Sequence, residues 1–275
     1  VVDYLKTEEP DVDTVLDLPK IAIVGRPNVG KSSLINSLLG NDRNIVTDIA
    51  GTTRDSIDTI YKAYGKEVIL VDTAGIRKKS KVNENIEFYS VMRSLRALEN
   101  ADVVVIIIDA TLGMESQDQN LFWMAHRLGK GVVILVNKWD LVAKDTQTAI
   151  KLEKAIRERL APINYMPIIF SSVLEKKRIF QVVEKMLEVY ENRSQKISTS
   201  KLNDVMLEVI SAYPPPAWKG KFIKIKYCTQ VSTPYPTFIF FCNLPQYIKE
   251  SYERYLENQM RKHFALDGTP ISIFF

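Results

Sequence analysis

Short, unbroken apolar segments recur between residues 20 and 172, and each is followed by a longer amphipathic stretch. The apolar segments read IAIVG, VILVD, VVVIIID, VVILVN and MPIIFSS, and the amphipathic stretches cover residues 31–40, 84–99, 116–128, 147–160 and 176–192. Strands that are apolar on both faces are typical of a mainly parallel sheet covered by helices on each side. The pattern therefore predicts an α/β fold, with residues 61–64 adding an antiparallel strand at the sheet edge.

Length and composition indicate two folded domains. The 275 residues exceed the roughly 100 to 200 expected of one domain, and 46% hydrophobic with 25% charged residues is an ordinary globular balance. After a polar stretch at 196–200 the pattern becomes helix, strand, strand, helix, strand, over 201–212, 221–229, 237–243, 246–263 and 271–275. We expect an acidic linker at 1–19, the α/β domain at 20–195 and a small α+β domain at 196–275.

A glycine-rich segment after the first apolar run predicts a phosphate-binding loop. Residues 25–32 fit GxxxxGK[ST] and stand between a strand and a helix, the context that makes this pattern specific. Backbone amides and the helix N-terminus of such a loop bind phosphate oxygens, Lys31 reaches the outer phosphates, and the Ser32 hydroxyl ligates Mg²⁺. The alternative is a plain turn between strand and helix. The predicted phosphate contacts are Gly25, Arg26, Pro27, Asn28, Val29, Gly30, Lys31, Ser32 and Ser33.

A carboxylate at the end of the second apolar run would complete the magnesium site. Asp72 follows VILV directly, so we expect it to hold the Mg²⁺ shell, while the amide of Gly75 bonds the terminal phosphate. An aspartate that only caps the strand is the competing interpretation. The other predicted contacts of this segment are Thr73, Ala74 and Ile76.

The NKWD segment at 137–140 predicts which base is bound. The Asp140 carboxylate can accept hydrogen bonds from N1–H and the 2-amino group of guanine, a donor pair that adenine lacks. Asn137 would tie this segment to the phosphate loop, and the aliphatic stem of Lys138 would cover the base; a helix-capping aspartate is the alternative. Further predicted contacts are Trp139 and, through a backbone N–H to guanine O6, Ser171, Ser172 and Val173.

Several classes of protein are excluded. The apolar runs are far shorter than the roughly 20 residues that cross a bilayer, and the acidic N-terminus lacks a secretory signal pattern. Cys228 and Cys242 stand outside any CxxC or Cys/His cluster, which argues against disulfides and structural zinc. We expect a cytoplasmic monomer without a membrane segment.

Charge is distributed unevenly along the chain. Residues 1–19 hold six acidic residues and one basic, net −5, whereas residues 196–275 hold ten basic and six acidic, net +4. Such an excess is either ordinary solvated surface or a contact area for a polyanion.

Together the motifs resemble a known family. GRPNVGKS (25–32), TDIAGTTRD (47–55), DTAGI (72–76) and NKWD (137–140) are similar to the Era-like GTPases, and specifically to the Der (EngA) double GTPases of bacterial ribosome assembly. The segments at 213–216, 252–261 and 268–271 resemble the KH-like C-terminal domain of that family. Since the family has two successive G domains, the resemblance implies a fragment with the second G domain and the KH-like domain.

The resemblance implies a P-loop GTPase fold, GTP or GDP with Mg²⁺, and a switch in ribosome biogenesis whose partners are the large ribosomal subunit, its RNA and the missing G domain. It implies that Thr53, with Thr52 as the competing choice, contacts Mg²⁺ and the terminal phosphate, and that residues 76–82 form the second switch. Ile76 stands where other GTPases orient water with a glutamine, so we expect slow hydrolysis. The resemblance also makes Asn28 a K⁺ ligand, the alternative being a bond within the loop. The expected catalytic residues are Asn28, Lys31, Thr53 and Gly75.

The second domain lacks the GxxG loop with which an ordinary KH domain clamps nucleic acid. RNA binding would then use the basic segment 219–226, where Lys224 and Lys226 share one face by period-two spacing. The alternative is that these lysines are only the solvent-exposed face of a half-buried sheet. Two other functions stay open: an RNA-binding module whose G domain turns over little GTP, and a GTPase of another RNA process such as tRNA modification.

Overall fold

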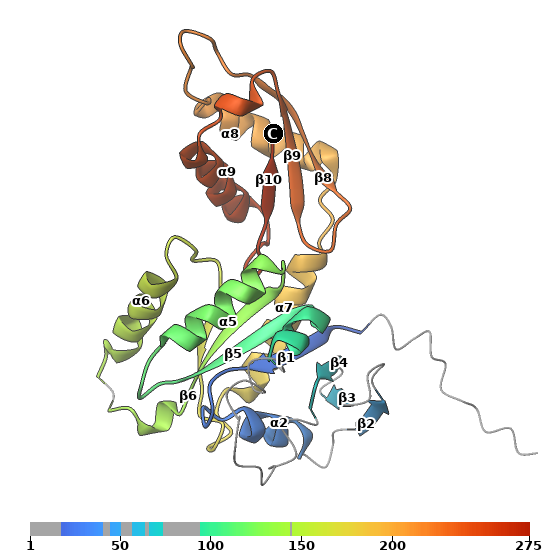
Figure 1. Cartoon of the computed structure of the whole chain (residues 1–275), viewed down its shortest axis with the longest axis vertical. Coiled ribbons are helices and arrows are strands. Elements are labelled where there is room, and N and C mark those ends of the chain that lie inside the picture. Colours follow the sequence, from blue (N-terminus) through green and yellow to red (C-terminus); the bar gives the residue numbers. More distant parts are fainter. Residues whose placement is uncertain (1–17, 41–44, 51–56, 64–65, 74–93, 144) are drawn as a thin grey trace, which may run out of the picture.

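The protein is described by a computed structural model over residues 18–40, 45–50, 57–63, 66–73, 94–143 and 145–275 (Figure 1). These residues build a seven-stranded sheet in the order β2-β3-β4-β1-β5-β6-β7 and a three-stranded sheet in the order β10-β9-β8. The strands of the larger sheet are β1 (Lys20–Val24), β2 (Ile45–Ala50), β3 (Ile57–Ala63), β4 (Lys66–Val71), β5 (Val103–Asp109), β6 (Gly131–Asn137) and β7 (Ile168–Phe170).

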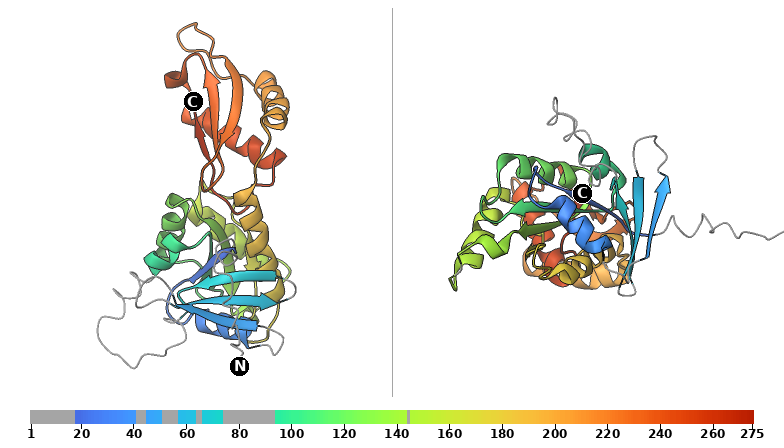
Figure 2. Two further views of the ribbon diagram at one scale, coloured as in Figure 1. Left: turned by 90° about the vertical axis from the view of Figure 1, so that its right-hand side faces the viewer. Right: turned by 90° about the horizontal axis from the view of Figure 1, so that it is seen from below.

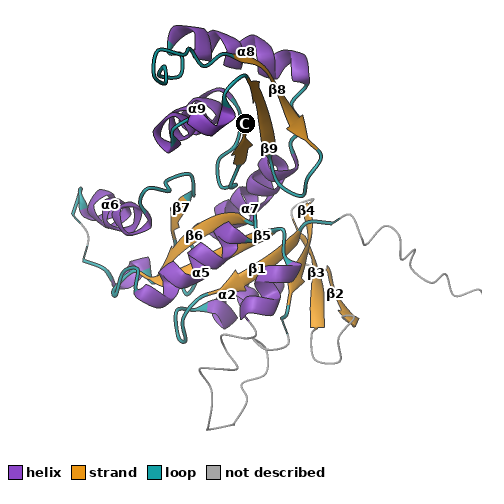
Figure 3. Cartoon of the chain, turned by 45° about the horizontal axis from the view of Figure 1, so that its top comes forward, coloured by secondary structure: helices purple, strands orange, loops and turns teal. Residues whose placement is uncertain are grey.

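Helices cover both faces of the larger sheet, as predicted (Figure 3). Alternate side chains of β5 show why: Val103, Val105 and Ile107 pack with α2 and α7, whereas Val104, Ile106 and Ile108 pack with α5, α6 and the helical stretch 94–100. β4, β1, β5, β6 and β7 run parallel, as their unbroken apolar sequences predict. The helices are α2 (Lys31–Leu39), α5 (Ser116–Arg127), α6 (Thr148–Leu160) and α7 (Ile179–Ser194), with the short η1 (Trp139–Leu141).

The antiparallel part of this sheet is larger than predicted. β3 pairs antiparallel with β4 as expected, but the prediction that it forms the edge is wrong, because β2 pairs antiparallel along its outer side. Figure 2 shows these strands side by side in blue and cyan. The β2 sequence, IVTDIA, places a threonine and an aspartate between apolar residues, so it lacks the continuous run that marks the other strands.

The second sheet has the predicted αββαβ order. Two of its strands are antiparallel, β8 with β9, and β10 is parallel to β9. β8 begins at Ile225 rather than near Lys221, because Lys221 and Trp218 form an isolated bridge around a turn before it. Cys228 is buried and Cys242 is half-buried, on the paired strands β8 and β9. The elements are α8 (Thr199–Ala212), β8 (Ile225–Val231), β9 (Thr237–Cys242), η2 (Pro245–Tyr247), α9 (Glu250–His263) and β10 (Ser272–Phe274).

The two sheets are joined at the amino end of β6. The Val132 amide donates to the Gly268 carbonyl at 2.6 Å, and the Gly268 amide donates to the Tyr165 carbonyl at 2.8 Å. The guanidinium of Arg261 lies 4.3 Å from the centre of the Tyr165 ring. Gly268 has φ +74°, and a Cβ there would stand 2.2 Å from a methyl of Val189, so the close approach requires glycine. No helix among the described residues has both the length and the apolar character needed to cross a membrane.

Candidate nucleotide site

The predicted site lies at the carboxyl ends of the parallel strands, where open α/β sheets bind ligands. Gly25 follows the end of β1, Asp72 follows β4, and Asn137 ends β6. The parallel pairing brings these ends together: β1 pairs with β4 up to Ala22 and Val71, and β6 pairs with β7 up to Val136 and Phe170. One edge of the sheet therefore carries all the predicted motifs that the structure describes.

The phosphate loop is shaped by residues with positive φ. Gly25 has φ +150° and Gly30 has φ +108°, and a Cβ would lie 2.4 Å from the Ile107 carbonyl oxygen at the first and 2.2 Å from Asn137 Nδ2 at the second. Both positions thus require glycine. Asn28 is left-handed as well, with φ 62°. α2 begins at Lys31 without an acidic residue in its first turn, which leaves its positive dipole end available to an anion.

Within this loop the predicted phosphate contacts differ in exposure. Lys31 Nζ donates to the carbonyls of Gly25 and Arg26 at 2.7 and 2.6 Å, so the ammonium lies across the loop. Burial lowers the pKa of Lys31, and the charge of Asp118 raises it in part. Val29 is buried and fills the inside of the loop. The remaining side chains of the segment that face solvent are Pro27, Asn28, Ser32 and Ser33.

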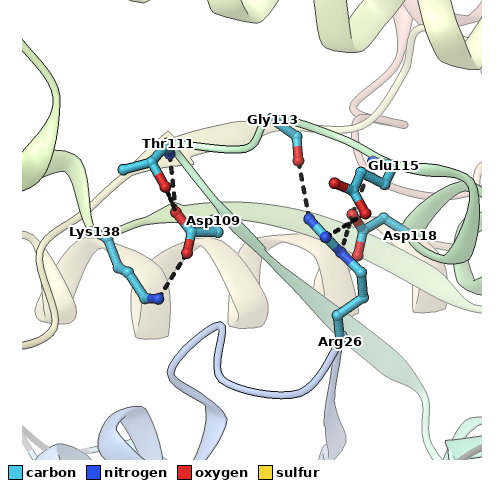
Figure 4. Close-up of polar contacts among 7 residues, drawn as sticks. All are labelled: Arg26, Asp109, Thr111, Gly113, Glu115, Asp118 and Lys138. Atoms are coloured by element: carbon cyan, nitrogen blue, oxygen red, sulfur yellow. Dashed lines mark hydrogen bonds and ion pairs between the residues drawn. The ribbon is translucent and has the colours of Figure 1, made fainter.

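Arg26 is held by a set of contacts that sequence reasoning missed (Figure 4). Its Nε donates to Asp118 Oδ2 at 2.9 Å, one terminal nitrogen lies 2.5 Å from a Glu115 carboxylate oxygen, and the other donates to the Gly113 carbonyl at 3.2 Å. Asp118 is fully buried, its Oδ1 has no partner among the described residues, and burial raises its pKa despite Arg26. The side chain of Arg26 therefore anchors the phosphate loop to the start of α5 instead of pointing into the loop.

Asn137 joins three loops through one buried side chain. Its Nδ2 donates to the Val29 carbonyl in the phosphate loop at 2.8 Å, and its Oδ1 accepts from the Val173 amide at 3.0 Å. The residue is 3% exposed. The predicted link between NKWD and the phosphate loop is therefore present, and it extends to the loop after β7.

The remainder of NKWD is packed on its neighbours. Lys138, with φ 61°, places its ammonium 2.7 Å from Asp109 Oδ2 at the end of β5 (Figure 4). Burial opposes ionisation of Asp109, but the bonds from Lys138 and Thr111 lower its pKa overall. The Trp139 ring lies against Phe170 with centroids 4.7 Å apart. Asp140 is half-buried in η1. Asp109 is thus a second charged anchor, for the base loop, that the sequence reasoning missed.

The three amides predicted to face guanine O6 are not equivalent. The Ser171 amide donates to the Val136 carbonyl at 2.8 Å, and the Val173 amide donates to Asn137. Ser172 faces Lys177 in an isolated antiparallel bridge, where the Lys177 amide donates to the Ser172 carbonyl at 2.9 Å, and among the described residues the Ser172 amide is the one of the three that donates no hydrogen bond of normal geometry. The backbone can therefore offer a ligand one N–H from this segment rather than three.

After β4, the structure describes Asp72 and Thr73 but not the residues that follow them, up to 93. Asp72 has φ 54°, and its amide donates to Asp58 Oδ1 at 3.0 Å. Thr73 is fully buried, with its hydroxyl 2.7 Å from that of Thr59, so its side chain supports the strand end. The predictions for Thr52, Thr53, Ala74, Gly75 and Ile76, like the second switch at 76–82, lie outside the described residues.

Comparison with known proteins agrees with this arrangement. A family model described as a 50S ribosome-binding GTPase matches residues 20–138, and one described as the KH-domain-like C-terminal part of EngA bacterial GTPases matches residues 196–275. GTPase Der of Christiangramia forsetii is 60% identical over 259 residues, which is 94% of this chain and 60% of that protein. GTPase Der of Flavobacterium johnsoniae is 57% identical over 274 residues, 100% of this chain and 63% of that protein. The chain belongs to the Der GTPase family.

The chain spans about 60% of the length of the Der proteins that it matches. Two solved structures with lower sequence identity are also similar to it. Era Y63A of Aquifex aeolicus bound to GDP·AlF4⁻ is 22% identical with a TM-score of 0.48, covering 94% of this chain and 92% of that one. The G domain of the T. maritima FeoB iron transporter is 24% identical with a TM-score of 0.42, covering 62% and 98%.

Proposed function

We propose that this Der-family chain binds GTP, hydrolyses it to GDP and phosphate, and acts as a nucleotide-dependent switch in biogenesis of the large ribosomal subunit. The observation that carries the proposal is the side chain of Asn137, which fixes the phosphate loop and the loop after β7 to the NKWD segment. Phosphate binding and base reading are thereby built into one unit. The names of the Der relatives and the description of the first family model support the same activity.

The phosphates are proposed to lie over the loop at the start of α2. Left-handed residues of this kind can turn backbone amides toward a bound anion, and Lys31, which bonds two loop carbonyls, could bond phosphate oxygens instead. Mg²⁺ prefers oxygen ligands, and the exposed hydroxyl of Ser32 and the carboxylate of Asp72 supply them at the same sheet edge. Magnesium held there would offset negative charge on the phosphates. Thr53 and Gly75 remain proposed partners of the metal and the terminal phosphate.

The base is proposed to be guanine, read by Asp140 and by the Ser172 amide. The carboxylate accepts from N1–H and the 2-amino group, and the single available amide donates to O6. The ion pair with Asp109 fixes the end of the Lys138 side chain, so that its aliphatic part can cover the base. The rigid base loop, held by Asn137 and Asp109, lets these bonds form without reordering of the loop.

The decisive experiment exchanges the base-reading carboxylate. Asp140→Asn should weaken GTP binding in calorimetry by about 100-fold or more, since two hydrogen bonds to a charged group contribute about 1.5–3 kcal/mol each. The same variant should gain affinity for xanthosine triphosphate, whose C2 carbonyl accepts from an amide. Asp145→Asn, which changes an exposed aspartate a few residues along, is the matched control and should bind GTP like wild type. Unchanged GTP preference in Asp140→Asn would refute the proposed base pocket.

Hydrolysis is proposed to depend on K⁺ rather than on a glutamine, with Asn28 as its ligand. Asn28 is exposed at the loop surface with φ 62°, so its amide oxygen is accessible to a cation. GTP turnover should be faster in KCl than in NaCl at equal concentration, and Asn28→Ala should remove the difference. Equal rates in the two salts for wild type would end the K⁺ proposal.

The rival function is an RNA-binding module that holds guanine nucleotide with little turnover. GTP turnover measured with and without large ribosomal subunits separates the two. A switch should hydrolyse GTP faster with subunits and co-sediment with them in a nucleotide-dependent way, whereas the static module should do neither. We propose that the chain acts as a monomer in the cytoplasm, with the large subunit and its RNA as partners.

A further inference from the structure

One face of the three-stranded sheet is left uncovered by the helices that the structure describes. α8 and α9 pack against the other face, where Phe238, Phe240 and Ile273 are buried. The uncovered face carries one exposed aromatic residue from each strand: Tyr227 on β8 is 42% exposed, Phe241 on β9 is 49% exposed, and Phe274 on β10 is 56% exposed.

These aromatic side chains form a row across the sheet. Tyr227 and Phe241 are register partners, and their ring centroids are 5.5 Å apart at an interplanar angle of 41°. Phe274 pairs with Ile239, two residues before Phe241 on the same strand. The row therefore runs from β8 through β9 to β10, the order of the strands in Figure 1.

The segment that contains β8 and β9 is basic and lacks acidic side chains. Residues 209–249 contain five lysines and no aspartate or glutamate. A register irregularity between Ile225 and Tyr227 leaves the consecutive residues Lys226 and Tyr227 both exposed. Lys224, two residues before Lys226, is exposed as well. No ion pair with a described residue is recorded for Lys224 or Lys226. The acidic residues of this part of the chain lie elsewhere, on α8 (Asp204, Glu208), on α9 (Glu250, Glu253, Glu257) and at Asp267.

The exposed aromatic rings together with the neighbouring lysines indicate what kind of partner this face can bind. Flat exposed rings in a row suit unpaired bases, which stack on aromatic side chains, and lysines beside them suit the phosphates of the same strand. A protein surface would have to complement both the rings and an uncompensated positive charge. A perfect duplex would present its backbone to the lysines but keep its base faces stacked internally, out of reach of the rings.

We propose that the uncovered face binds unpaired RNA, with bases stacked on Tyr227, Phe241 and Phe274 and phosphates bonded by Lys224 and Lys226. The inference rests on the proposed function in that it gives the ribosomal RNA partner a surface. This surface would bind RNA without a GxxG loop, since stacking of bases on the sheet needs no glycine clamp. The predicted shared face of Lys224 and Lys226 becomes the margin of this surface.

The test uses the whole chain with GDP and a fluorescently labelled RNA of about 10 nucleotides, within the site sizes of single-strand-binding folds. Fluorescence anisotropy should show tighter binding to the single strand than to the same sequence as a duplex. Phe241→Ala should weaken single-strand binding by about 5- to 150-fold, the range for losing one stacked base. Phe180→Ala removes a ring that is 42% exposed on α7, and as the matched control it should bind RNA like wild type.

Conservative variants separate stacking from general apolar docking. Phe241→Trp should retain RNA affinity, whereas Phe241→Leu, which keeps apolar area without a π face, should bind like Phe241→Ala. The double variant Lys224→Gln/Lys226→Gln should reduce the slope of log affinity against log salt by about 1.4, or 0.7 for each lost phosphate contact. Phe274→Ala provides a second probe, on a different strand.

Three results would overturn the proposal: no preference for single strand over duplex, an unchanged affinity in Phe241→Ala and Phe274→Ala, or wild-type affinity in Phe241→Leu, which would mean that the RNA is not held by stacking on this ring. GDP affinity and GTP turnover are measured on the same samples. Normal turnover with any of these RNA results would reject the surface alone and leave the GTPase proposal intact.

Discussion

The buried amide of Asn137 gives the sharpest prediction about the nucleotide site. Asn137→Ala removes the partner of the Val29 carbonyl, at 2.8 Å, and of the Val173 amide, at 3.0 Å. Both groups lie inside the protein, because Asn137 is only 3% exposed and Val29 only 2%. The substitution therefore leaves a donor and an acceptor without partners, in two loops that are 144 residues apart in sequence (173 − 29).

The cost follows from burial. An unsatisfied buried group costs about 1–3 kcal/mol, so two cost about 2–6 kcal/mol, and water entering the vacated space would recover part of that. We expect the free energy of unfolding without nucleotide to fall by about 2–4 kcal/mol. GDP should bind at least about 5-fold more weakly, because the loss of even one such bond from the loop unit corresponds to about 5- to 150-fold in affinity.

Denaturant unfolding and GDP calorimetry measure the two effects, with Asn36→Ala, an exposed asparagine on α2, as the control. Gly30→Ala sharpens the test, since its new Cβ would lie 2.2 Å from Asn137 Nδ2. In the Asn137→Ala background that atom is gone, so the double variant should lose less stability than the sum of the single variants. Wild-type stability and GDP affinity in Asn137→Ala would refute the view that this side chain holds the loops together.

Three further predictions concern the anchors around the site and the junction. Arg26→Ala leaves the buried Asp118 without its cation and should destabilise the protein by about 3–5 kcal/mol at pH 8; urea unfolding at pH 5 should show a smaller loss, because burial already raises the pKa of Asp118 and protonation removes its charge. Burial lowers the pKa of His126, so the unfolded state takes up the proton first and stability should fall as pH drops below about 6.5; His126→Gln should flatten that slope in urea titrations from pH 5 to 7.5. Gly268→Ala should lower thermal stability by about 1–3 kcal/mol through overpacking, more than Gly220→Ala, which has a similar φ of +78° but open space around it; equal losses would mean that backbone strain alone matters.

The sequence predicted most of the sheet because the buried strands differ from everything around them. β5 and β6 are apolar at nearly every position and are buried on both faces, so their pattern could not belong to an exposed element. β2 was not predicted because IVTDIA has two polar residues in its middle and so neither a continuous apolar run nor a polar–apolar alternation, and its place at the edge depends on pairing with β3. Pairing is a tertiary property that a local pattern does not carry.

For the site, the motif residues were predictable and their anchors were only partly so. Asp109 ends an apolar run in the same way as Asp72, and the same signal could have identified it. Asp118 gives no such signal: an acidic residue in the first turn of a helix is ordinary dipole chemistry, and its role follows from Arg26 92 residues away. The choice of Ser172 among three amides likewise needs the bonds made by Ser171 and Val173.

The position of the junction bears on how a nucleotide signal could reach the second domain. β6 connects the two regions, with Val132 bonded to Gly268 near its start and Asn137 at its end. Its seven residues, all buried, span about 20 Å within the sheet, and a buried strand packed between β5 and β7 is too rigid to slide between these neighbours. The second domain is further held by Arg261 over Tyr165 and by Asn192, which donates to the Asp267 carbonyl at 3.0 Å.

Nucleotide exchange at the carboxyl edge should therefore leave the uncovered aromatic face of the second sheet unchanged. RNA affinity of the whole chain, measured by anisotropy, should be equal within about 2-fold when GDP is replaced by a non-hydrolysable GTP analogue, since less than about 0.4 kcal/mol of coupling is expected through a rigid strand. Retention on ribosomal subunits should depend on nucleotide through surfaces at the carboxyl edge instead. An RNA affinity that changes tenfold with nucleotide would require the junction at Gly268 to move, and Gly268→Ala, by disturbing that junction, should then alter the coupling. The tenfold change would by itself refute the rigid connection through β6, and an unaltered coupling in Gly268→Ala would mean that the signal bypasses the junction.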